Sequence, residues 1–450
     1  MNRSKRNFSP VKVVAIGFAL LILLGAILLS TPMAASNGKP TNFIDAVFTA
    51  TSAVCVTGLV VENTALYWSA FGKTVIIILI QIGGLGFMTM ATLVSFAFRR
   101  RISLKERMVL AEALNQNELQ GIVRLTKNLI IGTFAIEGIG ASILTLRFMA
   151  DYPFWEALAK GFFHSVSAFC NAGFDLFGDV QGNSSLALYA RDPIVNVTVM
   201  CLVLLGGLGF FVWTDIFRCR SLKKLSTQTK IVLTTTAALL VGGAAFVFAF
   251  EYSNPHTIGN MPLGGKVLAS FFQSVTCRTA GFETVSQAAL TLPSKLISAI
   301  LMFIGGSPGS TAGGIKTVTF AVLFFGALSV VRGRENTNLF KRRIPFSVIR
   351  RSLAIVMLGI VVVFVAMIAL SVLEPELTMD VVLYEVVSAF ATVGLSCSVT
   401  PTLSAVSKVL VAVLMYFGRV GILTFAMSIA HKTDKSEDLY TYADANISVG

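Results

Sequence analysis

The sequence predicts an all-α membrane protein built from four parallel repeats, each made of a span, a short re-entrant loop and a second span. Of its 450 residues, 55% are hydrophobic and only 13% are charged, whereas soluble domains contain about 25% charged residues. Several apolar runs of about 20 residues are long enough to cross a hydrocarbon core of about 30 Å. Four glycine-containing segments also recur about 110 residues apart, which indicates an internal repeat.

We expect eight spans, paired around a central pore in a pseudo-fourfold arrangement. They cover about 13–30, 74–98, 128–149, 194–217, 230–251, 295–331 (interrupted), 349–373 and 405–430. The chain then divides into repeat 1 (1–98), a cytoplasmic linker with repeat 2 (99–217), repeat 3 (218–331), repeat 4 (332–430) and a cytoplasmic tail (431–450). A signal peptide is the alternative interpretation of residues 1–35, but the repeat needs this segment as its first span.

Basic residues gather in the connections that follow even-numbered spans, in FRRRISLKERMVL, FRCRSLKK and VRGRENTNLFKRRIPFSVIRR, and in the N-terminal MNRSKR. The opposite loops are acidic, as Glu62, Asp151 and Glu374 illustrate. Because cytoplasmic loops are enriched in Lys and Arg, we expect both termini in the cytoplasm and the chain in the cell membrane. The same rule explains the net charge of +13 without nucleic-acid binding.

Four segments align by eye: ATSAVCVTGL, HSVSAFCNAGF, QSVTCRTAGF and EVVSAFATVGL. Each follows a short amphipathic segment of about 11–17 residues, which at 1.5 Å per residue is too short to cross a membrane. Non-helical backbone at membrane depth is tolerated only where it is buried in protein or lines water. Four such loops in one orientation predict a ring around a central hole.

A ring of backbone carbonyls can replace the hydration shell of a monovalent cation, and glycine allows the backbone angles that aim carbonyls at one axis. The aligned triplets contain no acidic residue, so a neutral filter that favours K⁺ is predicted. Close helix packing is the alternative use of glycine. The predicted filter residues are Val56, Thr57, Gly58, Asn171, Ala172, Gly173, Thr279, Ala280, Gly281, Thr392, Val393 and Gly394.

A second motif follows each loop, as IGGLGF (82–87), LGGLGF (205–210), IGGSPG (304–309) and FGRVGI (417–422). In units 1 and 2 we interpret it as close packing within an unbroken helix. In unit 3 it becomes GGSPGSTAGGIKT, where proline and glycine disfavour a helix. This stretch is expected to leave the helix, lie in the ion path with few packing contacts, and move as a gate; a static kink is the alternative.

The gate is predicted to comprise Gly305, Gly306, Ser307, Pro308, Gly309, Ser310, Thr311, Ala312, Gly313, Gly314, Lys316 and Arg419. A phosphate-binding loop is excluded because Ile315 separates Gly314 from Lys316, so GxxxxGK[ST] is not met. Lys316 either lies at the inner vestibule or snorkels.

Two arginines fall at unusual repeat positions. Arg419 replaces a glycine of the second motif, and a mid-span arginine is costly enough to need interior partners. We expect it to bond the carbonyls or hydroxyls of 305–317 and to oppose cation passage; an ion pair with Glu137 is the alternative. Arg278 lies three residues before Gly281, where it either braces the filter from behind or pairs with Glu283.

The TVG of the fourth unit resembles the potassium-channel signature, and the four units resemble the Trk/Ktr/HKT superfamily of K⁺ transporters over almost the whole chain. The Ktr-type membrane subunits are the most similar members. The resemblance implies K⁺ uptake gated by the 305–317 loop and Arg419, a homodimer with one pore per protomer, and a cytoplasmic nucleotide-binding RCK ring (KtrA-like) as partner. It implies membrane lipids as surroundings and no organic cofactor. Some Na⁺-preferring relatives have Ser at the position of Gly58, so glycine there favours K⁺.

Three alternatives remain at this point. One is a Na⁺-coupled or Na⁺-selective transporter of the same superfamily. Another is a secondary transporter of a different fold, although such folds often use inverted repeats and these repeats are parallel. The third is a membrane enzyme, for which the sequence contains no catalytic triad, metal cluster or paired intramembrane carboxylates.

Overall fold

The computed structural model describes residues 10–86, 103–113, 121–178, 185–219 and 222–421, together with Thr89 and Thr92. The predicted tail 431–450 and the span ends 87–98 and 422–430 therefore lie largely or wholly outside the described residues. Within the described part the regular secondary structure is almost entirely helix. This agrees with the predicted all-α membrane protein with four repeats.

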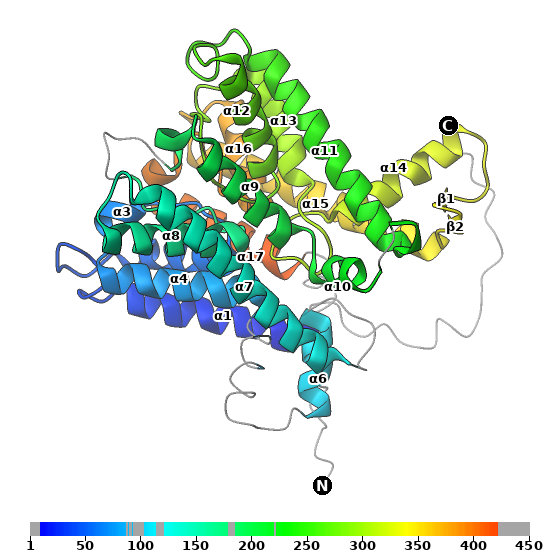
Figure 1. Cartoon of the computed structure of the whole chain (residues 1–450), viewed down its shortest axis with the longest axis horizontal. Helices are drawn as coiled ribbons and strands as arrows, with labels where there is room; N and C mark the ends of the chain where they lie inside the picture. The colour runs from blue at the N-terminus through cyan, green and yellow to red at the C-terminus, as the bar shows by residue number, and fades with distance from the viewer. Residues whose placement is uncertain are drawn as a thin grey trace.

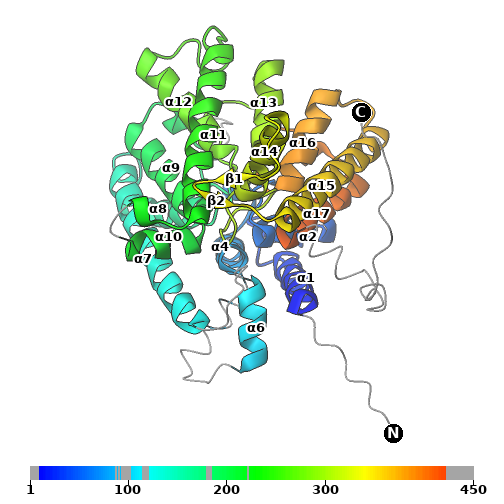
Figure 2. The same cartoon turned by 90° about the vertical axis from the view of Figure 1, so that its right-hand side faces the viewer.

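Each repeat consists of a long first helix, a short pore helix and a second helix, with a few minor elements between them (Figures 1 and 2). Unit 1 contains α1 (Pro10–Leu29), α2 (Phe43–Cys55), α3 (Thr64–Tyr67) and α4 (Ala70–Leu85), and is followed by α6 (Leu104–Ala113). Unit 2 contains α7 (Ile122–Phe148), α8 (Phe154–Phe169), η1 (Ala187–Tyr189), α9 (Pro193–Gly207) and α10 (Phe210–Arg218). Unit 3 contains η2 (Leu222–Lys224), α11 (Thr227–Glu251), α12 (Leu263–Thr276), α13 (Leu292–Phe303) and α14 (Thr317–Val331). Unit 4 contains β1 (Asn338–Leu339), β2 (Arg342–Arg343), α15 (Phe346–Leu373), α16 (Met379–Ala391), η3 (Thr400–Thr402) and α17 (Ala405–Val420).

The first helix of each unit is the continuous span. Four described helices are long and apolar enough to cross a membrane, at Lys12–Leu29, Ile122–Phe148, Thr227–Glu251 and Phe346–Leu373. The pore helices α2, α8, α12 and α16 have 13, 16, 14 and 13 residues, too few to cross a core of about 30 Å at 1.5 Å per residue. The half-length helix after each of these four spans is as predicted. Of the eight predicted spans, these four are long enough, and a fifth is if α9 and α10 form one bent span. The described second helices α4, α13 and α17 have only 16, 12 and 16 residues.

The second helices begin at polar caps. Ser69 accepts a hydrogen bond from the Gly72 N–H, Asp192 from the Ile194 and Val195 N–H groups, and Ser404 from the Ser407 N–H. Such caps satisfy backbone donors that the first helical turn leaves open. The second helices of units 1, 2 and 4 therefore begin at a defined residue, whereas α13 of unit 3 has no side-chain cap.

The second helices do not continue as the sequence predicted. The expected unbroken helix through LGGLGF is wrong, because α9 ends at Gly207 and α10 restarts at Phe210 after a bend of 94°. The cause is the last glycine of the motif: Gly86 after α4, Gly209 before α10 and Gly421 after α17 have φ values of +82°, +90° and +91°. These values lie outside the right-handed helical region.

The four units close into a ring. Each second helix packs against the pore helix of the next unit, as α4 on α8, α9 on α12, α13 on α16, and α17 on α2. Figure 2 shows the ring from one side, with units 2 and 3 opposite units 4 and 1. One buried apolar cluster joins units 1 and 2 to the pore helix and hairpin of unit 3, and a second joins units 3 and 4 to part of unit 1. The pore helices are thus held on both sides, and their C-terminal ends converge.

Candidate functional site

The four glycine hairpins meet at one place. A side chain added to any of the four glycines would collide with a backbone carbonyl of the next hairpin in the ring. The pairs are Gly58 with Ala172, Gly173 with Ala280, Gly281 with Val393, and Gly394 with Thr57. Because the fourth pair returns to unit 1, the hairpins surround a common axis. The alternative that these glycines only pack helices does not account for this ring of hairpin-to-hairpin contacts.

The four hairpins also share one backbone conformation. Their glycines have φ values of +94°, +70°, +75° and +95° in units 1 to 4. Two residues before each glycine stands a non-glycine residue that is also left-handed: Val56, Asn171, Thr279 and Thr392, with φ between +53° and +66°. The β-branched residues Val56, Thr279 and Thr392 rarely adopt this conformation, so they give no sequence signal for it. Asparagine, as at Asn171, is enriched there. The repeated strain indicates that the surrounding structure imposes the hairpin geometry.

Hydroxyl groups of the pore helices brace these hairpins. Ser52 accepts a hydrogen bond from the Gly58 N–H at 3.0 Å, and Ser388 accepts one from the Gly394 N–H at 3.1 Å. In the other two units the hydroxyl instead donates to the carbonyl after the glycine, from Ser167 to Phe174 at 2.8 Å and from Thr276 to Phe282 at 2.7 Å. Sequence reasoning missed these braces, although the aligned SA and VT pairs of the first motif contain them.

The stretch from Gly305 to Lys316 is non-helical, as predicted. It is not a loop with few packing contacts, however, because none of its residues is exposed. Ser307 and Thr311 donate their N–H groups to the carbonyls of Gly207 and Gly206 at 3.0 and 3.3 Å, and Phe210 donates to the Gly309 carbonyl at 2.9 Å. The bend between α9 and α10 is what frees these backbone groups to bond the loop.

This loop reaches two opposite hairpins. The Thr311 hydroxyl donates to the Asn171 amide oxygen of unit 2 at 3.0 Å. Gly313 packs so closely against Thr392 of unit 4 that a Cβ on this glycine would collide with it. Units 2 and 4 are the two neighbours of unit 3 in the ring, so the loop contacts the hairpins on both sides of its own unit.

Arg419 holds this loop from unit 4. Its guanidinium donates to the carbonyls of Thr311 in the loop and of Gly83 in α4, and to the Gly84 carbonyl at 3.1 Å. The predicted contact with 305–317 is thereby confirmed. The alternative ion pair with Glu137 is absent from the described residues, where the Glu137 carboxylate accepts two hydrogen bonds of 3.1 Å from the Gln81 amide and a longer one of 3.9 Å from the Cys170 thiol.

Two other cationic side chains, Lys316 and Arg278, also donate hydrogen bonds to carbonyls of the loop. Lys316 donates to the Ala312 carbonyl at 2.6 Å, so it caps the loop rather than extending away from it. Arg278 donates to the Gly305 carbonyl at 3.2 Å and is only 5% exposed. The described residues contain no ion pair between Arg278 and Glu283; the side chain of Arg278 is instead bonded to the start of the 305–317 loop.

Comparisons with known proteins identify relatives over almost the whole chain. The family model described as "TrkH: Cation transport protein" matches residues 13–439. The chain is 41% identical to the Ktr system potassium uptake protein B of Bacillus subtilis, over 99% of this chain and 97% of that protein. It is 38% identical to the potassium/sodium uptake protein NtpJ of Enterococcus hirae, over 100% of this chain and 99% of that protein.

A solved structure has the same fold. The crystal structure of the potassium transporter TrkH from Vibrio parahaemolyticus matches 96% of this chain and 87% of that one, with a TM-score of 0.74 and 17% sequence identity. At that identity the match concerns the fold alone. The model match over most of the chain and the two close relatives identify a transport protein rather than an enzyme: the chain belongs to the TrkH family of cation transport proteins.

Proposed function

We propose that this protein takes up K⁺ across the cell membrane, through the ring formed by the four glycine hairpins. The observation that supports this most directly is the common conformation of the hairpins around a single axis. Uncharged carbonyl groups arranged in this way replace the water shell of a weakly hydrated cation. The relatives named as potassium uptake proteins support the same ion.

Growth on limiting K⁺ and uptake of radioactive Rb⁺, in cells that lack their own K⁺ uptake, test this function. The chain is expected to restore both. Gly281→Ala is expected to abolish uptake, because Gly281 has φ +75° and its added methyl would meet the Val393 carbonyl. Gly138→Ala is the matched control, since a Cβ on Gly138 meets nothing within 4 Å. Normal uptake by Gly281→Ala would contradict the assignment of the ring.

We further propose that the 305–317 loop and Arg419 form the gate. The loop lies against the hairpins of units 2 and 4, and Arg419 links its Thr311 carbonyl to the Gly83 and Gly84 carbonyls of unit 1. Removing those bonds and the positive charge should favour passage, so Arg419→Ala is expected to raise Rb⁺ flux into proteoliposomes several-fold, while Arg419→Lys should lie between it and the native protein. Hydrogen bonds to a charged group contribute about 1.5–3 kcal/mol each, enough for such a change. An Rb⁺ flux of Arg419→Ala equal to that of the native protein would show that Arg419 is not part of the gate.

A Na⁺-coupled or Na⁺-carrying function is the second candidate, because one relative is named as a potassium/sodium uptake protein. The neutral hairpins and Gly58 favour K⁺ alone. Uptake of ²²Na⁺, and Rb⁺ uptake measured with and without external Na⁺, distinguishes the two. Stimulation of Rb⁺ uptake by Na⁺ would favour the coupled function.

The proposed assembly is a homodimer, with both termini in the cytoplasm, that binds a separate nucleotide-binding RCK ring through the basic segments. Three relatives are named as parts of a Ktr system, and the hairpin β1–β2 presents Arg342 and Arg343 on its exposed strand β2. A cysteine introduced at Lys341 should react with a membrane-impermeant thiol reagent only from the cytoplasmic side. Reaction from outside would reverse the proposed orientation.

A further inference from the structure

Arg278 joins the third glycine hairpin to the loop of the same unit. It lies three residues before Gly281, and its Nη2 donates to the carbonyl of Gly305, where the loop begins. Its own carbonyl accepts a hydrogen bond from the Asn171 amide of unit 2 at 3.4 Å. Arg278 therefore contacts the loop through its side chain and a neighbouring hairpin through its backbone.

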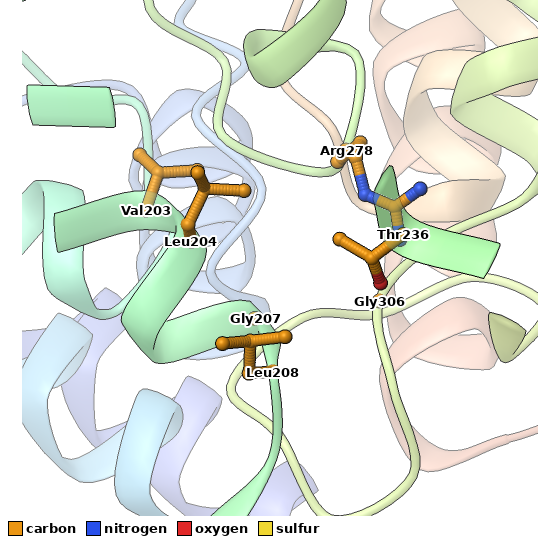
Figure 3. Close-up of a pocket in the computed structure, with 7 residues that line it drawn as sticks. All are labelled: Val203, Leu204, Gly207, Leu208, Thr236, Arg278 and Gly306. Atoms are coloured by element: carbon orange, nitrogen blue, oxygen red, sulfur yellow. The ribbon is translucent and has the colours of Figure 1, made fainter. Parts of the chain in front are cut away.

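The other guanidinium nitrogen of Arg278 points into a small cavity. Figure 3 shows this cavity between the end of α9 and the start of the loop, with Gly207 and Gly306 beneath it and the Arg278 guanidinium beside Thr236 of α11. Arg278 Nη1 and Thr236 Oγ1 are both buried, and neither has a hydrogen-bond partner. Buried polar groups in proteins almost always have partners, so two such groups on one cavity indicate a bound ligand.

The cavity determines which ligand fits. Its volume is about 10 Å³, which corresponds to about one water molecule. A guanidinium N–H donates only, whereas a threonine hydroxyl both donates and accepts, so one water can bond both groups. The rest of the lining is apolar side chains of α9 and glycine backbone.

Three cationic side chains donate to carbonyls of this one loop: Arg278 to Gly305, Arg419 to Thr311, and Lys316 to Ala312. The loop contains no acidic residue. Arg419 comes from the last helix and Lys316 from the loop itself. Arg278 is the member of this set that comes from a glycine hairpin, so it connects the ring with the loop directly.

We propose that Arg278 is a positioning residue that holds the start of the 305–317 loop against the third hairpin, and that a single water molecule between Arg278 Nη1 and Thr236 Oγ1 completes its hydrogen bonds. The proposal rests on the proposed function, since the loop must gate an ion path for its position to matter. Without the hydrogen bonds of Arg278, the loop leaves the proposed ion path more easily and the basal Rb⁺ flux rises.

Rb⁺ flux into proteoliposomes that contain the full chain alone tests the proposal. Arg278→Gln is expected to raise basal flux about tenfold, as for loss of one hydrogen bond from a charged group. Arg278→Lys keeps the positive charge but not the planar guanidinium with its several N–H donors. Its basal flux should therefore lie between those of Arg278→Gln and the native protein. Thr236→Val should raise the basal flux about threefold, because it removes one neutral hydrogen bond. Thr236→Ser keeps the hydroxyl and should behave as the native protein.

Thr133→Val is the matched control, because Thr133 also has a buried hydroxyl without a partner but lies in α7, away from the cavity. Elution as a single species in size-exclusion chromatography shows that each variant is folded, and the ratio of Rb⁺ to Na⁺ flux should stay within about twofold of native because the glycine backbone is unchanged. A native chain without Rb⁺ flux would refute the proposed function. Native flux combined with unchanged flux in Arg278→Gln and Thr236→Val would refute the brace alone.

A high-resolution map separates the water from other ligands. A peak at hydrogen-bond distance from both Arg278 and Thr236, lost in Thr236→Val, is the expected result. An anomalous signal from bromide at this position would show that the cavity binds an anion and would refute the proposed water. An empty cavity would refute the proposed site as a whole.

Discussion

At the scale of single residues, the four hairpins share a backbone conformation but not its hydrogen bonds. Ser52 and Ser388 accept from the glycine N–H, whereas Ser167 and Thr276 donate to the carbonyl after the glycine. Units 4 and 1 are neighbours in the ring, as are units 2 and 3. The ring therefore has two chemically different halves, one formed by units 4 and 1 and the other by units 2 and 3. In units 2 and 3 the carbonyls of Phe174 and Phe282 accept hydrogen bonds from the pore helices.

Ser52→Ala and Ser388→Ala should each lower the preference for Rb⁺ over Na⁺. Without the hydroxyl, the buried glycine N–H loses its acceptor and the hairpin gains freedom, and a net hydrogen bond of about 1 kcal/mol corresponds to roughly fivefold. Paired measurements of ⁸⁶Rb⁺ and ²²Na⁺ uptake give the ratio. Ser142→Ala, which removes an exposed hydroxyl bonded within α7, should leave it unchanged. An unaltered ratio in both filter variants would show that the serines are not needed for selectivity.

At the scale of helices, the first glycine of the second motif sets how closely two helices approach. A Cβ on Gly83, Gly206 or Gly418 would overlap the carbonyl of Val54, Phe169 or Phe390 respectively. Each of these carbonyls stands four residues before the filter glycine of the same unit. The packing expected for these glycines is thus observed, and it supports the pore helix just behind its hairpin.

Gly206→Ala should therefore destabilise the protein more than an ordinary helix substitution. Overpacking usually costs about 1–3 kcal/mol, and here the obstacle is a backbone carbonyl that cannot rotate away. Thermal inactivation in detergent is the measurement, with a fall of several degrees expected. Gly242→Ala in α11 is the control, because a Cβ there meets nothing within 4 Å and alanine favours the helix. Equal behaviour of the two variants would contradict the packing argument.

At the scale of the whole molecule, ion pairs connect successive units. Lys408 at the start of α17 pairs with Asp45 of α2 at 2.8 Å, and Lys295 at the start of α13 pairs with Asp380 of α16 at 2.9 Å. Each joins a second helix to the pore helix of the next unit, and all four side chains are at least partly buried. The pair between Lys408 and Asp45 closes the ring between the last unit and the first.

A double-mutant cycle of Lys408→Met and Asp45→Asn should give a favourable interaction energy of roughly 1 kcal/mol, within the range found for contacting residues. Either single variant should inactivate at a lower temperature in detergent than the native protein, because it leaves the partner charge half-buried and unpaired. The double variant should recover part of the loss. Strict additivity of the two changes would show that the pair does not stabilise ring closure.

Much of this architecture could be predicted from the sequence, because it depends on periodic features. The four glycines, the half-length helices and the departure of 305–317 from the helix follow from repeat spacing and from the properties of glycine and proline. The contact of Arg419 with the loop followed from the cost of an unpaired charge. These predictions needed only local rules and the repeat alignment.

Other features depend on tertiary contacts that no local rule contains. Gly209 has φ +90° and separates α9 from α10. From the sequence alone, GGLG is equally compatible with an unbroken, closely packed helix. The break is stabilised by hydrogen bonds with the loop of unit 3, which the local sequence does not reveal. The left-handed Val56 and Thr392 contradict their own propensities. The buried, well-bonded state of the loop was also unexpected, because composition alone does not reveal acceptors in a different unit.

The contact of α17 with α2 has a consequence for how the protein is made. These helices begin at Ala405 and Phe43, so the pore helix synthesised first meets one of its neighbours only after the last unit has emerged from the ribosome. Until then unit 1 presents an unfilled lateral groove to the lipid or to the insertion machinery. A nascent chain that stops before unit 4 consequently leaves the first hairpin unsupported on one side, and quality-control proteases would meet it in that state.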